Sequence, residues 1–291
     1  MATDALASGS RRSRFTPATL LLLVFLTLGA FVAALPLLYM ASTSLKTLAE
    51  TITRSSAIPF NPLFWPLEPR WENYVQAWDE ARFSLYFRNS VVISFTTAAG
   101  VLAVSSLAAY AFAKIRFTGR NAVFTILLST LMIPETVLLI PNFILVSRLG
   151  WIDRLAALTV PFMGSAFFIF LLRQYMAQIP DELIECSRID GAPHGRILIS
   201  VVLPLSRAPL ATVAFLELLG SWNSLQWPLV VTQTPRWRPI SVGLTTFISE
   251  AGPQTQLRMA GAVIAVAPIV LLYFLAQRQF TETIARTGLK G

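Results

Sequence analysis

Six long runs of apolar residues constrain this chain more than any other feature of its sequence. A helix that crosses a bilayer needs about 20 mostly apolar residues, because it rises about 1.5 Å per residue across about 30 Å of hydrocarbon. The runs that reach this length are residues 18–42, 87–112, 121–146, 155–176, 209–232 and 258–277. The sequence therefore predicts an all-α, polytopic membrane protein with six transmembrane helices.

The composition is that of a protein whose main solvent is lipid. Hydrophobic residues make up 55% of the chain and charged residues only 13%, whereas a soluble domain carries about 25% charged residues. The net charge of +8 would suggest nucleic acid binding in a soluble protein. Here the charges lie in short clusters between apolar runs. We interpret them as topology signals and expect membrane lipid, not nucleic acid, as a partner.

Proline residues interrupt several of the predicted spans. In a helix bundle, neighbouring helices satisfy the carbonyls that a proline frees, so kinked spans are tolerated. The prolines concerned are Pro36, Pro134, Pro141, Pro161, Pro228 and Pro268. We therefore keep these segments as spans that bend.

The lysines and arginines of the short loops predict that both termini face the cytoplasm. The first apolar run is longer than the roughly 7–15 residues of a signal-peptide core, so we interpret it as an uncleaved anchor. The predicted segments are a cytoplasmic N-terminal tail (1–17), a first transmembrane helix (18–42), an external loop (43–86), a core (87–280) with a cytoplasmic loop (178–204), and a cytoplasmic C-terminal tail (281–291).

The predicted external loop is rich in aromatic residues, among them Trp65, Trp71 and Trp78. Two interpretations of these residues stay open. Either the loop offers a docking surface to an external partner, or its tryptophans form an aromatic belt that holds the loop at the membrane interface.

The cytoplasmic loop at 178–204 carries the signals of a short helix, a break and a second helix. Pro180 suits the first helical position, where its missing N–H costs nothing. Gly191 suits the left-handed residue that ends such a helix. Pro193 can start the second helix, and Pro204 marks a kink or a stop beyond it. A surface helix held between two spans is suited to transmit force from a cytoplasmic partner.

The same loop resembles a motif in the permease subunits of bacterial binding-protein-dependent ABC importers. That motif reads Glu-Ala-Ala, three residues, Gly, nine residues, Ile, one residue and Leu-Pro. Every interval is matched here by Glu185-Cys186-Ser187, Gly191, Val201 and Leu203-Pro204. Three residues depart from the motif, but they keep small or β-branched side chains that permit close packing against a partner. They are Cys186, Ser187 and Val201.

Other stretches resemble the carbohydrate-type members of that family. Asn89-Ser90 near the start of the second span and Trp222-Asn223 in the fifth are examples. The C-terminal residues, which end in Leu289-Lys290-Gly291, resemble the second permease of maltose-type and glycerol-3-phosphate-type systems.

The resemblance implies a type I ABC importer permease fold and a role as one half of a transporter in the bacterial plasma (inner) membrane. Such a subunit pairs with a second homologous permease, contacts two ATPase subunits, and receives a sugar or sugar-like solute from an extracytoplasmic solute-binding protein. The residues that the resemblance places against the ATPase are Glu185, Cys186, Ser187, Arg188, Asp190, Gly191 and Ala192.

The resemblance also implies that this chain is not an enzyme and binds no cofactor, since ATP and Mg belong to the partner ATPase. The sequence agrees on one point. It contains no Gly-x-x-x-x-Gly-Lys-Ser/Thr phosphate loop, so nucleotide that drives transport must be bound by another polypeptide.

Four residues of the predicted spans are candidates for the solute path. Glu135 and Glu217 lie in apolar runs, where a carboxylate costs at least a few kcal/mol. Either they line the path and bind solute hydroxyls, or they pair structurally with a neighbouring helix. Trp222 and Asn223 either hold a sugar by stacking and hydrogen bonding, or join helices to one another.

Two other classes of function compete with ATP-driven import. A membrane-embedded enzyme needs a catalytic or metal-binding constellation, which a chain with one histidine (His194) and one cysteine (Cys186) does not offer. A secondary transporter or channel for a small polar solute could use Glu135 or Glu217 as a proton site, but it leaves the loop motif unexplained. The solute stays open between several sugars and glycerol phosphate.

Overall fold

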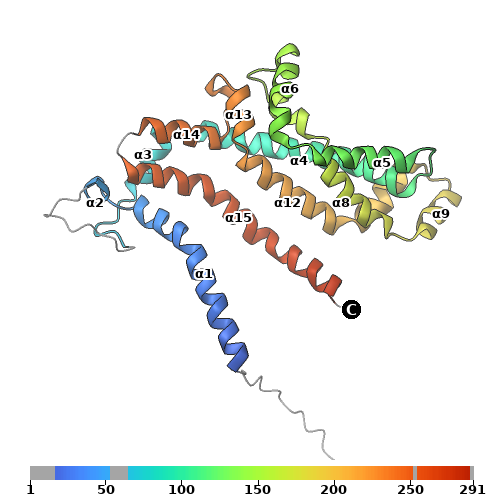
Figure 1. Ribbon diagram of the computed structural model, residues 1–291, viewed down its shortest axis with the longest axis horizontal. Coiled ribbons are helices and arrows are strands. Elements are labelled where there is room, and N and C mark those ends of the chain that lie inside the picture. The colour runs from blue at the N-terminus through green and yellow to red at the C-terminus, as the bar shows by residue number, and fades with distance from the viewer. Residues whose placement is uncertain (1–16, 53–64, 252–253, 289–291) are drawn as a thin grey trace, which may run out of the picture.

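The computed structural model describes residues 17–52, 65–251 and 254–288, with side chains as far as Phe274. The described chain is all-helical, as predicted (Figure 1). The predicted N-terminal tail lies outside the described residues except for Pro17. In chain order the elements are α1 (Pro17–Ser44), α2 (Leu48–Ile52), α3 (Glu72–Glu80), α4 (Phe83–Lys114), α5 (Arg120–Ser129), η1 (Thr130–Met132), α6 (Glu135–Arg148), α7 (Leu155–Thr159), η2 (Val160–Phe162), α8 (Ala166–Ala177), α9 (Asp181–Ile189), α10 (His194–Ile197), η3 (Leu198–Val202), α11 (Leu203–Leu205), α12 (Arg207–Asn223), α13 (Gln226–Val231), η4 (Pro235–Trp237), α14 (Ile240–Glu250) and α15 (Thr255–Gly288).

Three helices of the described chain are long and apolar enough to cross a membrane unbroken, namely α1, α4 and α15 as far as Phe274. Three further candidates are pairs of helices bent at a short break, and counting each pair as one span raises the number to six. The pairs are Arg120–Met132 with Glu135–Arg148 (bent by 101°), Leu155–Phe162 with Ala166–Ala177 (45°), and His194–Leu205 with Arg207–Asn223 (83°).

The predicted fifth span, 209–232, is not one helix. α12 ends at Asn223, Ser224 is extended, and α13 starts at Gln226. Pro228 supplies a reason, because it has no N–H to donate to the Ser224 carbonyl, as a continuous helix requires. The Ser241 hydroxyl donates to that carbonyl instead, at 2.6 Å. A side chain of α14, 17 residues further along the chain, therefore stabilises the break.

Two other boundaries differ from the sequence-based expectation. α4 begins at Phe83, not at residue 87, because Phe83 is fully buried against α14 and α15. The predicted C-terminal tail, 281–291, is helical as far as Gly288, since α15 continues through it.

The predicted external loop contains α2 and α3, with residues 53–64 outside the described chain. The buried Asn73 fixes α3 to the end of α1, because its Nδ2 donates to the carbonyls of Ser44 (2.8 Å) and Lys46 (2.9 Å). Trp65 and Trp71 are exposed, as both interpretations of the aromatic residues require. The choice between docking surface and aromatic belt stays open.

The 32-residue helix α4 is the central element of the fold (Figure 1). Near Lys114 it packs on α8, α9 and α12, and near Phe83 it packs on α3, α14 and α15. A helix of this length spans about 48 Å at 1.5 Å per residue. Gly100 permits close packing, because a Cβ there would overlap the side chain of Met163. Because α9 packs near Lys114 and α3 packs near Phe83, these two helices lie at opposite ends of α4.

The first helix is the least covered part of the described chain. α1 has a mean hydropathy of 2.6 over its most apolar window, and none of that window is buried. The C-terminal part of α1 packs on α15, whereas its N-terminal part points away from the rest of the fold (Figure 1). Its exposed leucines and phenylalanines therefore need lipid or another membrane protein around them.

Candidate functional site

The short helix α9 occupies the loop that the sequence singled out. It starts at Asp181 after an extended Pro180, so the proline precedes the helix by one residue and does not occupy its first position. Gly191 has a φ of 77°, as predicted. Its N–H donates to the Arg188 carbonyl and the Ala192 N–H to the Ser187 carbonyl, both at 3.0 Å. These two bonds define a Schellman ending, which turns the chain sharply after α9.

One face of α9 is attached to the helix bundle. Ile184 is 5% exposed and packs in a core with Leu172 and Met176 of α8 and Val101 of α4. This core holds the helix at a fixed distance from α4 and α8, because buried side chains are close-packed.

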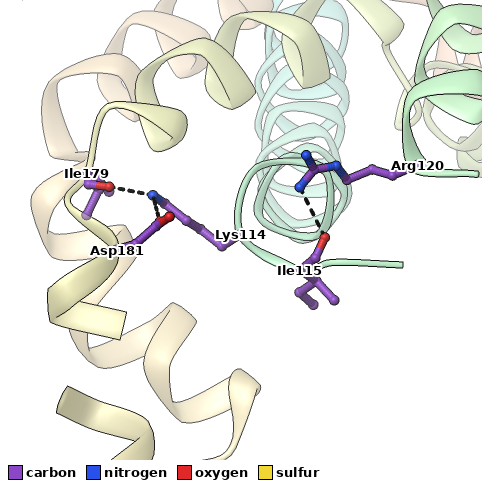
Figure 2. A network of polar contacts seen from close by, with 5 residues as sticks. All are labelled: Lys114, Ile115, Arg120, Ile179 and Asp181. Carbon is purple, nitrogen blue, oxygen red and sulfur yellow. Dashed lines mark hydrogen bonds and ion pairs between the residues drawn. The ribbon is translucent and has the colours of Figure 1, made fainter. Parts of the chain in front are cut away.

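A charged contact adds a second attachment. Lys114, at the end of α4, lies with Nζ 2.6 Å from Oδ1 of Asp181 and also donates to the Ile179 carbonyl (Figure 2). The hydrogen bond from Lys114, and then its charge, hold the pKa of the Asp181 carboxyl below its usual range. The same figure shows Arg120 reaching back to the Ile115 carbonyl at 3.4 Å, which closes the turn before α5.

The segment after Gly191 rises from α9 and bends into α12. His194 starts α10, and its Nδ1 lies 2.9 Å from the hydroxyl of Tyr110 on α4. The chain then passes through a π-helical turn, η3, and through α11, which contains Pro204. The 83° bend at Ser206 follows, two residues after Pro204, where the sequence predicts a kink or a stop.

Most other side chains of α9 are exposed. Glu185, Cys186 and Asp190 are exposed, Leu183 is 43% exposed, and Ile189 is 86% exposed. A short helix that is fixed on one side and presents apolar and acidic side chains on the other has the form of a docking element.

The two candidate glutamates lie on different spans. Glu135 is exposed and is the first residue of α6, directly after the break at Pro134. Glu217 is half-buried in the middle of α12. The structure brings the two carboxylates within electrostatic range of each other, where like charges repel.

Trp222 and Asn223 lie at the end of α12, and both have structural partners. The Trp222 indole N–H donates to the Ala265 carbonyl of α15 at 3.1 Å, and its ring packs edge-on against Phe87 at 5.5 Å between centroids. Asn223 is exposed, and its Nδ2 donates to the Leu219 carbonyl at 2.9 Å. Trp222 therefore joins three helices.

Comparison with known proteins identifies the family. Residues 100–286, more than half of the chain, match the family described as "Binding-protein-dependent transport system inner membrane component". The chain belongs to this family. It is an inner-membrane, multi-pass permease of an ABC transport system that works with a solute-binding protein, and it is a transport component, not an enzyme.

Relatives of known function support this assignment of the permease. It is 34% identical to the arabinooligosaccharides transport system permease protein AraQ of Halalkalibacterium halodurans over 90% of this chain and 93% of that protein. It is 35% identical to the sn-glycerol-3-phosphate transport system permease protein UgpE of Yersinia enterocolitica over 73% of this chain and 78% of that one. It is 31% identical to the lactose transport system permease protein LacG of Rhizobium radiobacter over 88% of this chain and 91% of that protein.

A solved structure has the same fold as the permease. A chain in the crystal structure of a bacterial ABC transporter involved in the import of the acidic polysaccharide alginate superposes with a TM-score of 0.80, at 24% identity, over 89% of this chain and 95% of that chain. The expected permease fold is therefore present.

The sequence pointed to Asn89 and Ser90 only by resemblance, and the structure gives them a physical role in the permease. The buried Asn89 donates through Nδ2 to the carbonyls of Arg236 and Arg238, each at 3.0 Å. Ser90 Oγ accepts from the N–H of Ile240 at 2.7 Å. Together they fix the start of α14 to α4. A polar pair at the entry of an apolar run was the signal that could have predicted such a contact.

Proposed function

We propose that this permease forms half of the translocation path of a sugar importer and that α9 couples the path to an ATPase. The observation that carries the proposal is the construction of α9. Ile184 and the Lys114–Asp181 pair fix it to the bundle, while Glu185, Cys186 and neighbouring residues face away from it. A displacement of α9 by a partner is transmitted to α4 and α8 because the packed core between them is not compressible.

In the proposed arrangement six spans cross the membrane, and both termini and the loop 178–204 face the cytoplasm. The excess of lysine and arginine in the loops on that side supports this orientation. The position of α9 and α3 at opposite ends of α4 supports it too, because the loop 43–86 is then external. The core, 87–280, carries the path, and α1 faces lipid or the second permease.

The complete importer then contains a second homologous permease, two ATPase subunits that hold ATP and Mg, and an external solute-binding protein. A chain in another crystal structure superposes on this permease with a TM-score of 0.60. That structure is of a bacterial alginate ABC transporter in complex with an alginate pentasaccharide-bound periplasmic protein. The segment of this chain that contacts the ATPase is made of Glu185, Cys186, Ser187, Arg188, Asp190, Gly191 and Ala192.

The proposed cargo is a sugar or a sugar-like solute. AraQ and LacG are named for arabinooligosaccharide and lactose transport and UgpE for sn-glycerol-3-phosphate transport. Glu135 and Glu217 are proposed as the path residues that accept hydrogen bonds from solute hydroxyls. Asn223 is exposed at the end of α12, the helix that contains Glu217, and offers an amide, and Trp222 beside it offers a ring for stacking.

Purification from the native membrane followed by reconstitution tests this proposal. The expected result is a complex with an ATPase and a second permease, whose ATP hydrolysis and sugar uptake both rise when the solute-binding protein and its sugar are added. A permease that purifies alone and takes up solute in response to an ion gradient would contradict it.

A further inference from the structure

An open cavity of about 310 Å³ lies at the turn between α4 and α5. Its volume is at the lower end of the range for small-molecule sites, about 300–1,000 Å³. No aspartate or glutamate occurs between residues 81 and 134, the stretch that contains this turn. The residues that line the cavity are Arg116, Phe117, Gly119, Arg120, Asn121 and Ala122. Two guanidinium groups and no acidic side chain make it a cavity for an anionic group.

The two arginines of this cavity are not neutralised within the part of the chain that the structure describes. Neither Arg116 nor Arg120 forms an ion pair there. Asp181 attracts Arg116 electrostatically, but its carboxylate is bound to Lys114. Arg120 points away from that pair and donates to the Ile115 carbonyl at 3.4 Å, near the upper limit for a hydrogen bond (Figure 2). Both guanidinium groups therefore keep donors for an anion.

An apolar surface leads from the cavity along α5. Phe117 in the cavity wall is 42% exposed, and Val123 and Ile126 further along are 50% and 67% exposed. The last two are three residues apart and therefore lie on one side of the helix. α5 belongs to one of the bent pairs that can form a membrane span, where an exposed apolar face needs an apolar partner. Positive charge followed by apolar side chains is the order that complements a phospholipid, with its phosphate above its acyl chains.

We propose that this cavity binds the phosphate of an anionic phospholipid, such as phosphatidylglycerol, whose acyl chains lie along Val123 and Ile126. Arg116 and Arg120 donate charge-assisted hydrogen bonds to the phosphate oxygens, because the guanidinium fork matches phosphate geometry. Asn121 offers an amide to the hydroxyls of the headgroup. Free phosphate gains nothing from the apolar face, which is why lipid is the better occupant. The proposal depends on the membrane location of the permease, and not on its cargo or on its coupling to an ATPase.

The test measures lipid binding to the delipidated full-length permease, purified in detergent with the subunits that accompany it. The probes are dioleoyl phosphatidylglycerol, dioleoyl phosphatidylcholine with the same chains and no net charge, and inorganic phosphate, with bound lipid counted by native mass spectrometry. Arg116→Gln removes one charge of the cavity, and Arg207→Gln removes an exposed arginine outside it. Ala122→Trp fills the cavity, whereas Thr125→Trp adds the same ring one turn further along α5.

We expect the wild type to bind phosphatidylglycerol at least tenfold more tightly than phosphatidylcholine. Arg116→Gln should weaken this binding about fivefold, the factor that corresponds to about 1 kcal/mol per basic residue near an anionic membrane. Ala122→Trp should weaken it more than Arg116→Gln does, while Arg207→Gln and Thr125→Trp should leave it at the wild-type level. Equal affinity for the two lipids, or wild-type affinity in both Arg116→Gln and Ala122→Trp, would overturn the proposal. Displacement of the lipid by inorganic phosphate would also overturn it, because the cavity would then be a site for a free anion.

Discussion

Lys114 joins the last turn of α4 to Asp181 in the first turn of α9, with 2.6 Å between Nζ and Oδ1. The lysine side chain is 3% exposed and the aspartate side chain 65% exposed. The pair therefore stands at the border between the helix bundle and water. A lysine that is buried to this extent depends on its few partners, here Asp181 and the Ile179 carbonyl, to compensate for lost hydration.

The first prediction is that Asp181→Asn loosens α9 without unfolding the core. Amide hydrogen exchange in residues 181–189 should become about two- to fivefold faster, since exposed ion pairs are individually weak, while exchange in α4 and α8 stays unchanged. Glu182→Gln is the matched control, because it removes a carboxylate of the same turn that is not paired with Lys114 in the described structure. Equal exchange rates in both variants would show that the ion pair does not hold α9.

The second prediction concerns the pH dependence of the same contact. Hydrogen bonding to Lys114 lowers the pKa of Asp181 in the folded protein, whereas the unfolded value is about 3.9. A lowered folded pKa means that the stabilisation is complete above about pH 4 and is lost only as the pH falls through the folded pKa. Carboxyl NMR titration should find a lower Asp181 pKa in the wild type than in Lys114→Met. An identical pKa in the two proteins would contradict the contact.

The third prediction tests the turn that ends α9. A Cβ on Gly191 meets nothing within 4 Å, so only its φ of 77° opposes a side chain, at a cost of about 1 kcal/mol or more. Gly191→Val should lower binding-protein-stimulated ATP hydrolysis and sugar uptake together, several-fold, in reconstituted vesicles.

Gly195→Ala is the control for that experiment. Gly195 also has free space around it but lies inside α10 without a positive φ, so alanine there should leave both activities at the wild-type level. Normal coupling in Gly191→Val would remove the main support for α9 as the coupling element. The ATPase activity of the isolated nucleotide-binding subunit should be the same in every case.

The fourth prediction concerns orientation. Cys186 is the only cysteine of the chain and is exposed on α9. A membrane-impermeant maleimide should label it in permeabilised cells and in inverted vesicles, but not in intact cells. Labelling of intact cells would place α9 outside and reverse the proposed topology.

The fifth prediction concerns the two membrane carboxylates. Glu135→Gln and Glu217→Gln keep the size of each side chain and most of its hydrogen bonding while removing its charge. At least one of them should lower sugar uptake about tenfold with normal expression, as expected when a charged acceptor of solute hydroxyls becomes neutral. Native uptake in both variants would assign the carboxylates to structural contacts.

Features that depend on neighbouring residues could be predicted from the sequence. The positive φ at Gly191 and the bend after Pro204 follow from local chemistry, and both are present. The hydrogen bond from Ser241 that satisfies the freed Ser224 carbonyl could not be predicted in the same way, because Ser241 lies in another helix.

The same distinction between local and distant contacts applies to the candidate site. The position of α9 between two spans was predictable, but its attachment to Lys114 joins residues 67 positions apart. The contact of Trp222 could not be predicted for the same reason, since its partner carbonyl is 43 residues away in α15. Apolar periodicity identifies spans, whereas contacts between spans depend on their packing.

The 83° bend at Ser206 has a mechanical consequence for the permease. A push along the axis of α10 and α11 reaches α12 almost perpendicular to the axis of α12. Such a push moves the start of α12 sideways and does not slide the helix lengthwise. The far end of α12 is held to α15 through Trp222, so α12 tilts about that end and the displacement decreases from the bend toward Glu217. An axial motion of α10 and α11 thus becomes a tilt of α12.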